Sequence, residues 1–269
     1  MSEFADKTVL VTGASRGIGL ATAQQFAALG AKVGLVARDQ ALLEAAAGSI
    51  STATHVVATD LSDPVQCGRA VDEVVGALGP IDVLVSCAGG LYRDFVEDVK
   101  LAEFEEIWRV HVGGGLWLTQ RVLPGMRERG YGRIVLVSSE VGLFGAPSYA
   151  SYCASKFALV GLAEVLYHEL AGSGVRACAV CPGNTQTAQM EAEIQWGPAG
   201  GATFEKGMTP EYVARRIVAA AAGRAPVVII DRPYLRSFFK LMGGPRGLLR
   251  TIVHGAYKPL LRSRAARSG

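Results

Sequence analysis

The 269-residue sequence lacks any run of about 18 uncharged apolar residues, the length that a membrane-spanning helix needs, although half of its residues are hydrophobic. The amino-terminal stretch MSEFADKTVLVTG has neither the basic nor the apolar segment of a signal peptide, and we expect it to lead directly into a strand. The five cysteines are odd in number and lack the paired Cys/His spacing of a zinc site. We therefore expect reduced, mostly buried thiols, no bound metal and a cytoplasmic location.

Acidic side chains are absent from residues 232–269, which carry nine Lys/Arg, while the formal net charge of the whole chain is only +3. Residues 1–231 contain no basic stripe interleaved with aromatic residues, which argues against nucleic-acid binding. Two interpretations of the basic, hydrophobic C-terminal extension at 232–269 stay open. It contacts an anionic membrane peripherally, or it packs against the body or a neighbouring subunit. Its three prolines exclude one long helix.

Short apolar runs rich in β-branched residues alternate with longer segments of helical periodicity. The runs are continuously apolar, which is typical of parallel strands covered on both faces. We expect strands at 8–13, 32–37, 54–60, 81–89, 132–139, 175–183 and 225–230, and helices at 17–30, 39–49, 63–79, 101–129, 151–171 and 210–222. The pattern predicts a doubly wound α/β fold, with a ligand site at the carboxyl ends of the strands.

The turn after the first strand reads TGASRGIG (12–19). Glycines there allow a tight turn and the close approach of a pyrophosphate to the free N–H groups that begin the next helix. The GxxxGxG spacing differs from GxGxxG, but the strand before it and the helix after it support a nucleotide site. The residues that we expect to hold the cofactor here are Gly13, Ser15, Arg16, Gly17, Ile18 and Gly19.

The second strand leads to Arg38, where enzymes that bind NAD usually place an acidic residue for the ribose 2′-hydroxyl. Arg16 and Arg38 together suit a 2′-phosphate, because guanidinium groups bind phosphate in a bidentate manner. We therefore predict NADP(H) in preference to NAD(H). Asp39 is the competing feature, since a small rearrangement would make it a ribose ligand.

Tyr152 and Lys156 stand four residues apart, on one face of an expected helix. A nearby lysine cation favours the phenolate, so we expect Lys156 to lower the pKa of Tyr152. Tyr152 can then exchange a proton with a carbonyl or alcohol oxygen while hydride moves to or from a nicotinamide. Ser139, at the end of the preceding strand, is expected to hydrogen-bond the substrate oxygen.

Taken together, these motifs resemble those of the short-chain dehydrogenases/reductases (SDR family, with TGxxxGxG and YxxxK motifs), over about residues 5–231. The resemblance rests on TGASRGIG (12–19), Asp60-Leu61, CAGG (87–90), VSS (137–139), YCASK (152–156) and PGNTQT (182–187). It implies a Rossmann-like, doubly wound seven-stranded parallel sheet in the order 3-2-1-4-5-6-7, with helices on both faces, as a single domain at 1–231. It also implies a homodimer or homotetramer.

The resemblance assigns roles to individual residues. Ser139, Tyr152 and Lys156 would be catalytic, and Tyr152 and Lys156 would also contact the cofactor, Lys156 through the nicotinamide ribose. The other implied cofactor contacts run from the adenine to the nicotinamide: Asp60, Leu61, Ala88, Gly89, Pro182, Gly183, Thr185 and Thr187.

Two positions depart from the family's pattern. Cys87 replaces the asparagine of an NAG motif, and we expect local repacking rather than lost function. His111, in the stretch WRVHVGGGLWLT, replaces an asparagine at a helix distortion, whose main-chain carbonyl holds a water linked to the lysine. We group His111 with the catalytic residues as a structural brace of this proton relay and not as a new base. Glycines 113–115 suit such a distortion.

Residues 184–209 are expected to form a substrate lid. Its bulky members and the wall that they would face are Met190, Ile194, Trp196, Phe204 and Met208, and Leu91, Tyr92, Leu143, Phe144 and Tyr149. These side chains favour a bulky apolar or lipid-like substrate, although they would equally suit an ordinary core.

The leading hypothesis is an NADP(H)-dependent oxidoreductase that interconverts a ketone and a secondary alcohol, acting as a reductase with Tyr152 as the acid/base. One alternative is a 3-oxoacyl thioester reductase that acts on a carrier-protein or CoA thioester. An alternative of another class is a nucleotide-binding regulator with weak catalysis.

Overall fold

A computed structural model describes residues 2–195 and 207–230 of the chain. The strands are β1 (Thr8–Thr12), β2 (Lys32–Ala37), β3 (Thr54–Ala58), β4 (Ile81–Ser86), β5 (Gly132–Val137), β6 (Val175–Pro182) and β7 (Val227–Ile230). The α-helices are α1 (Gly17–Ala28), α2 (Gln40–Gly48), α3 (Pro64–Leu78), α4 (Leu101–Trp108), α5 (Gly114–Glu128), α6 (Ala150–Glu169), α7 (Ala188–Gln195) and α8 (Pro210–Ala222). The extension at 232–269 and lid residues 196–206 lie outside the described residues.

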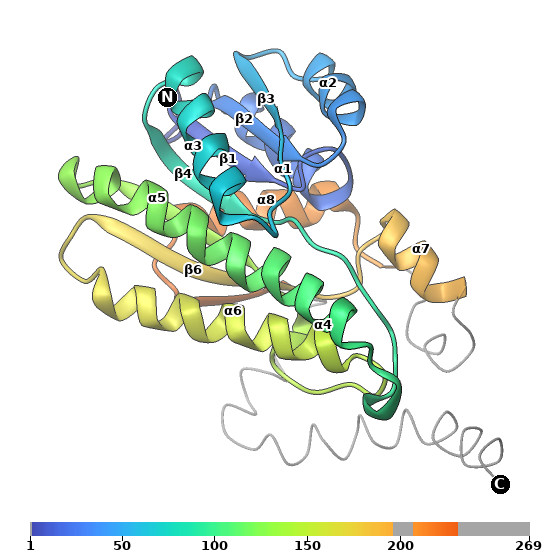
Figure 1. Ribbon diagram of the computed structural model, residues 1–269. Coiled ribbons are helices and arrows are strands. Elements are labelled where there is room, and N and C mark those ends of the chain that lie inside the picture. Colours follow the sequence, from blue (N-terminus) through green and yellow to red (C-terminus); the bar gives the residue numbers. More distant parts are fainter. Residues whose placement is uncertain (1, 196–206, 231–269) are drawn as a thin grey trace, which may run out of the picture.

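The seven strands form one parallel sheet in the order β3-β2-β1-β4-β5-β6-β7, which confirms the expected fold (Figure 1). β1 pairs with β2 on one side and with β4 on the other. The chain therefore winds outward in both directions from β1 and β4, and the loops after these two strands part at the carboxyl edge of the sheet. This is where a doubly wound sheet places its ligand crevice.

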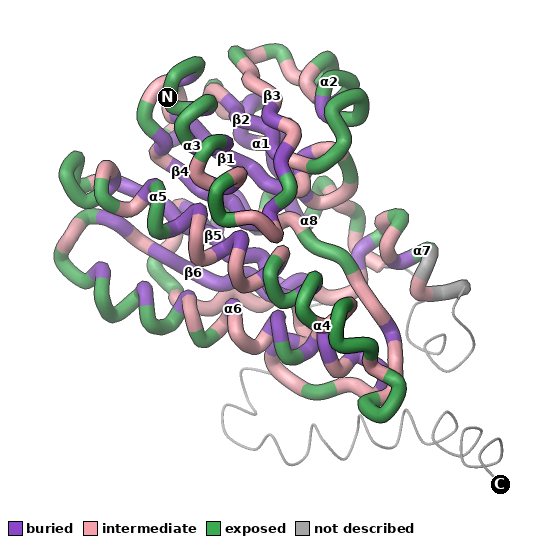
Figure 2. The backbone as a smooth tube through the Cα atoms, in the orientation of Figure 1, coloured by how far each residue is buried: buried purple, intermediate pink, exposed green. Residues whose placement is uncertain are grey.

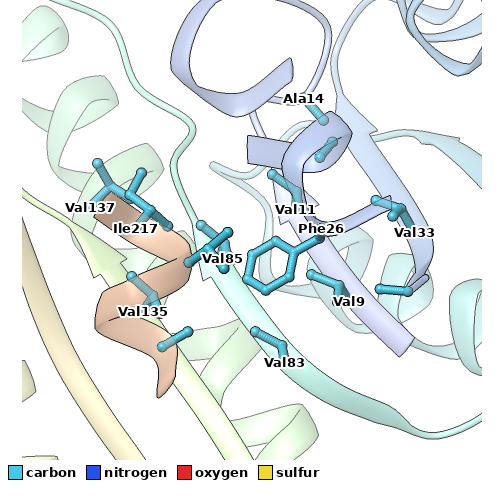
Figure 3. Packing of buried hydrophobic residues seen from close by; sticks show 14 of the residues in the cluster. Val9, Val11, Ala14, Phe26, Val33, Val83, Val85, Val135, Val137 and Ile217 are labelled. Carbon is cyan, nitrogen blue, oxygen red and sulfur yellow. The ribbon is translucent and has the colours of Figure 1, made fainter. Parts of the chain in front are cut away.

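A hydrophobic layer covers each face of the sheet. The strands are the most buried part of the fold (Figure 2). Along β1, Val9 and Val11 belong to the layer beneath α1, α2 and α8, whereas Leu10 belongs to the layer beneath α3, α5 and α6. Figure 3 shows Phe26 of α1 among the strand valines, with Ile217 of α8 nearby. Because successive residues of a strand point to opposite faces, a continuously apolar strand supplies both layers.

The helix expected at 101–129 is not one continuous α-helix. A π-helical turn at Arg109–Gly113 separates α4 from α5, and His111 lies inside it. The expectation of a single helix is therefore corrected, while the distortion expected at His111 is present. Single π-helical turns within helices are often found at functional sites.

Among residues 2–195 and 207–230, no helix combines the length and the apolar character that crossing a bilayer requires.

Candidate active site

A cleft of about 1790 Å³ opens where the segments after β1 to β6 meet. Every residue that we expected to contact the cofactor lines this cleft, from Gly13 in the first turn to Thr187 before α7. Ser139, Tyr152 and Lys156 line it as well. Within the described part of the chain, His111 is the one predicted catalytic or cofactor-binding residue that does not line the cleft.

The glycine-rich turn packs tightly against the loop after β4. Gly13 has φ +65°, and a Cβ there would lie 2.9 Å from the Cα of Ala88. A Cβ on Gly19 would lie only 2.1 Å from the carbonyl oxygen of Gly13. The Thr12 hydroxyl accepts hydrogen bonds from the N–H groups of Cys87 and Ala88, each at 3.0 Å. The glycine-rich turn therefore lines the cleft at the first turn of α1. The pyrophosphate of a dinucleotide would bind at such a helix N-terminus.

The residues that would contact the 2′ position of the adenosine ribose lie at the end of β2. Arg38 lines the cleft together with Arg16, and its Nη1 lies 3.8 Å from Oε1 of Glu106. The Asp39 carboxylate accepts a hydrogen bond of 3.0 Å from the N–H of Leu42 and so caps α2. Asp39 therefore has a structural role that explains an acidic residue at this position.

The three residues that we expect to be catalytic lie at the junction of β5 and α6. The Lys156 ammonium donates a hydrogen bond of 3.0 Å to the carbonyl oxygen of Val137 and lies 5.4 Å from the centre of the Tyr152 ring. Ser139 and Tyr152 line the same cleft, and Ser139 acts to lower the pKa of Tyr152. The Lys156 ammonium lies on one side of the phenol ring.

Burial controls the titration of this group. It raises the pKa of Tyr152 well above its ordinary value, and the negative charge of Glu193 raises it further, against smaller effects of hydrogen bonds with Gln189 and Ser139. Burial also lowers the pKa of Lys156 to about 8. The pKa of Tyr152 is therefore raised, opposite to the lowering expected from the sequence, because desolvation of the phenolate dominates. Tyr152 is held protonated.

His111 is enclosed by protein groups on both sides of its ring, and only 2% of it is exposed. Its Nε2 accepts a hydrogen bond of 3.1 Å from the N–H of Gly90, so Nδ1 carries the proton and donates to the Ser155 hydroxyl at 2.8 Å. The Ser155 hydroxyl in turn donates to the carbonyl oxygen of Tyr152 at 2.8 Å. His111 thus links the loop after β4 to the first turns of α6.

The surroundings of His111 favour the neutral imidazole. Burial lowers the pKa of His111 well below 6.5, and the positive charge of Lys156 lowers it further. The ring also packs against Gly89, where a Cβ would lie 2.6 Å from Nε2. His111 is therefore a positioning residue in this geometry.

The five cysteines are free thiols, and all but Cys87 are buried. Cys87 lines the cleft, and burial raises its pKa to about 11. Cys178 and Cys181 on β6 are spaced as CxxC, which corrects the expectation that the cysteines lack paired spacing. Both are buried, and burial raises the pKa of each to about 12. We conclude that these thiols act as packing groups.

The lid and wall expectations are met in part. The cleft is lined by six of the expected side chains: Met190, Met208, Leu91, Tyr92, Phe144 and Tyr149. Leu143 does not line it in the described structure. Trp196 and Phe204 lie outside the described residues, as does the side chain of Ile194.

Several polar residues that line the cleft were not predicted, including three that contact other residues of the site. Gln189 and Glu193 line the cleft from α7, and Glu106 lines it from α4. Gln189 and Glu193 are four residues apart, which places them on one helical face. That spacing could have found them had a helix been expected within 184–209.

The doubly wound sheet, the glycine-rich turn and the Ser139, Tyr152 and Lys156 group define an oxidoreductase of the Rossmann-like, nicotinamide-binding class. Residues 7–197 match the short chain dehydrogenase family, and the chain belongs to that family.

Individual relatives agree with this assignment. The chain is 32% identical over 262 residues to the ketoacyl reductase HetN of Nostoc sp., covering 96% of this chain and 90% of HetN. It is 35% identical over 221 residues to the 3-ketodihydrosphingosine reductase of Bos taurus, covering 78% of this chain and 67% of that protein. The crystal structure of levodione reductase superimposes with a TM-score of 0.79 at 27% identity, covering 85% of this chain and 97% of the other.

Proposed function

We propose that the protein is an NADP(H)-dependent reductase that converts a bulky, largely apolar or lipid-like ketone to a secondary alcohol. The observation that carries the proposal is that Ser139, Tyr152 and Lys156 line one cleft, with the Lys156 ammonium 5.4 Å from the centre of the Tyr152 ring. A phenol is protonated at neutral pH and can donate its proton to a carbonyl oxygen, as the reduction of a ketone requires. The nicotinamide, when bound, would supply the hydride.

The protein's own groups can carry the rest of the reaction. The Ser139 and Tyr152 hydroxyls would hold the substrate oxygen by hydrogen bonds. As negative charge develops on that oxygen, Tyr152 donates its proton to it. The Lys156 ammonium, 5.4 Å from the ring centre, stabilises the phenolate that remains.

NADP(H) is the proposed cofactor because Arg16 and Arg38 both line the cleft, while the neighbouring Asp39 carboxylate caps α2. Two guanidinium groups near one ribose would bind a 2′-phosphate by charge-assisted hydrogen bonds. Cofactor oxidation with a panel of neutral ketones tests the proposal. Turnover with NADPH should exceed that with NADH, and a protein that oxidises neither cofactor with any ketone would contradict it.

A 3-oxoacyl thioester reductase is the second candidate, favoured by the similarity to the ketoacyl reductase HetN over nearly the whole chain. The substrate carbonyl is again a ketone, so the same Ser139 and Tyr152 chemistry would serve. Parallel assays with acetoacetyl-CoA and with free ketones of matched size distinguish the two candidates by their kcat/KM values.

We also propose that the protein is a cytoplasmic homodimer or homotetramer, with residues 232–269 either contacting anionic membrane or packing against the body or a neighbouring subunit. The support is the basic, apolar composition of this segment. Light scattering would measure the assembly. Co-sedimentation with anionic vesicles, comparing the full chain with a chain that ends at Asp231, tests the contact; equal sedimentation of the two would contradict it.

A further inference from the structure

A carboxylate lies on the α7 side of the cleft, close to the catalytic hydroxyl. Glu193 Oε2 accepts a hydrogen bond of 3.0 Å from the hydroxyl of Tyr149, and its Oε1 accepts one of 3.3 Å from Nε2 of Gln189. Gln189 and the charge of Glu193 both influence the pKa of Tyr152. The Glu193 carboxylate therefore lines the cleft near Tyr152, and its charge acts there although burial raises its own pKa.

The position of this carboxylate is fixed by residues from three segments. Arg93, from the loop after β4, is only 7% exposed. Its Nη1 donates to the main-chain carbonyl oxygen of Glu193 at 3.4 Å, and its Nη2 donates to the Ser148 hydroxyl at 3.0 Å. The same guanidinium lies 4.5 Å from the centre of the Tyr149 ring. Glu193 is thus pre-organised before any substrate binds.

The Glu193 carboxylate and the Arg93 guanidinium differ in their access to the cleft. Glu193 lines the cleft, whereas Arg93, in the described structure, does not. Tyr149 and Tyr152 line the cleft beside Glu193, with their ring centres 6.3 Å apart. A carboxylate that lines a cleft attracts a cation by direct charge.

We propose, resting on the proposed function, that Glu193 determines substrate specificity by selecting ketones that carry a positively charged group, such as an ammonium, beyond the reacting carbonyl. The same carboxylate disfavours ketones with a negative charge at that place, because a partly buried charge is weakly screened. The apolar side chains Phe144 and Met190 line the same cleft and accommodate the uncharged part of the molecule.

Three methyl ketones of matched size provide the test. The first ends in a trimethylammonium group, the second in the isosteric tert-butyl group, and the third is levulinate, which ends in a carboxylate. We expect kcat/KM with NADPH to fall in that order, with the cation preferred to the anion by about tenfold or more. The difference should lie mainly in KM, because the charge is remote from the bond that reacts.

The variant Glu193→Gln keeps the size and the hydrogen-bonding capacity of the side chain but removes its charge. It should bring the three kcat/KM values together, mainly by raising KM for the cation. Glu164→Gln, on an exposed carboxylate of α6 outside the cleft lining, is the matched control and should leave the ratios as in the wild type. Melting temperature and NADPH affinity verify that each variant is folded.

Dissociation constants of the three ketones, measured by calorimetry, decide the inference even if turnover is slow. The cation should bind more tightly than its neutral isostere, and Glu193→Gln should abolish the difference. Equal affinity for the cation and its isostere, or ratios that Glu193→Gln leaves unchanged, would overturn the inference. If the neutral ketone is still reduced in that case, the proposed reductase function stands and only the role of Glu193 fails.

Discussion

His111 Nδ1 lies 2.8 Å from the hydroxyl oxygen of Ser155, and that hydroxyl donates to the carbonyl oxygen of Tyr152. The other ring nitrogen accepts from the N–H of Gly90. Both ring nitrogens therefore form hydrogen bonds with protein groups. Through Ser155, the ring stabilises the backbone of α6 at Tyr152. This geometry supports the interpretation of His111 as a brace rather than a base.

We expect His111 to make the protein less stable as the pH falls below about 6.5. Its pKa is well below 6.5 in the folded chain because of burial and Lys156, so below 6.5 the unfolded chain binds a proton that the folded chain does not. This contribution to stability is complete above pH 6.5 and is lost as the pH falls toward the folded pKa, with a slope that approaches ~1.4 kcal/mol per pH unit.

Urea unfolding at a series of pH values measures this slope. His111→Asn removes the titrating group while keeping a polar side chain, and its free energy of unfolding should depend less on pH over the same range. The same slope in both proteins would show that His111 is not the source.

The pH dependence of the rate should contain no limb from His111 near pH 6.5, because the ring is neutral above that pH and does not line the cleft. The expected limb lies near pH 8 instead, where Lys156, with its pKa lowered to about 8, loses the charge that stabilises the phenolate. Profiles of kcat/KM for ketone reduction, compared between wild type and His111→Asn, check both statements. A limb near 6.5 that disappears in the variant would contradict the first.

Tyr152→Phe should lower kcat by roughly 10²- to 10⁴-fold, since it removes the hydroxyl that donates the proton. The NADPH dissociation constant should change little, because the ring remains and Lys156 keeps its bond to Val137. Single-turnover rates and fluorescence titration separate the two effects. Tyr167→Phe, an exposed position on the same helix, is the control; a fully active Tyr152→Phe enzyme would remove the proposed mechanism.

The sheet and the cofactor cleft were predictable because their signals are local. Apolar runs such as the one through Val9, Leu10 and Val11 indicate a strand that is covered on both faces. The glycine-rich turn follows this strand directly in the chain. The contact between Arg93 and Glu193 joins residues 100 positions apart, so only the folded chain brings them together. The direction of the Tyr152 pKa shift could not be predicted for the same reason. Burial by segments distant in the sequence raises this pKa, whereas the sequence spacing shows only the nearby lysine.

The Arg38 side chain is the main test of the cofactor proposal. Arg38→Ala should weaken NADPH binding by about tenfold and leave NADH binding unchanged, because only NADPH has the 2′-phosphate that the guanidinium would bind. Fluorescence titration with both nucleotides gives the two dissociation constants. If Arg38→Ala left the NADPH constant unchanged, the preference for NADP(H) would have to come from elsewhere or be absent.

Glu106→Gln should strengthen NADPH binding, the opposite of the effect expected for Arg38→Ala. The Glu106 carboxylate lies 3.8 Å from Arg38 and also accepts a hydrogen bond of 2.7 Å from the Tyr92 hydroxyl. It would compete with a 2′-phosphate for the guanidinium and would repel that phosphate directly. Because the pair is exposed, we expect only about a two- to fivefold gain in NADPH affinity, with NADH unchanged. The gain should shrink at high salt and vanish in the Arg38→Ala background, and a gain of the same size for NADH would instead indicate a general effect of charge at the mouth of the cleft.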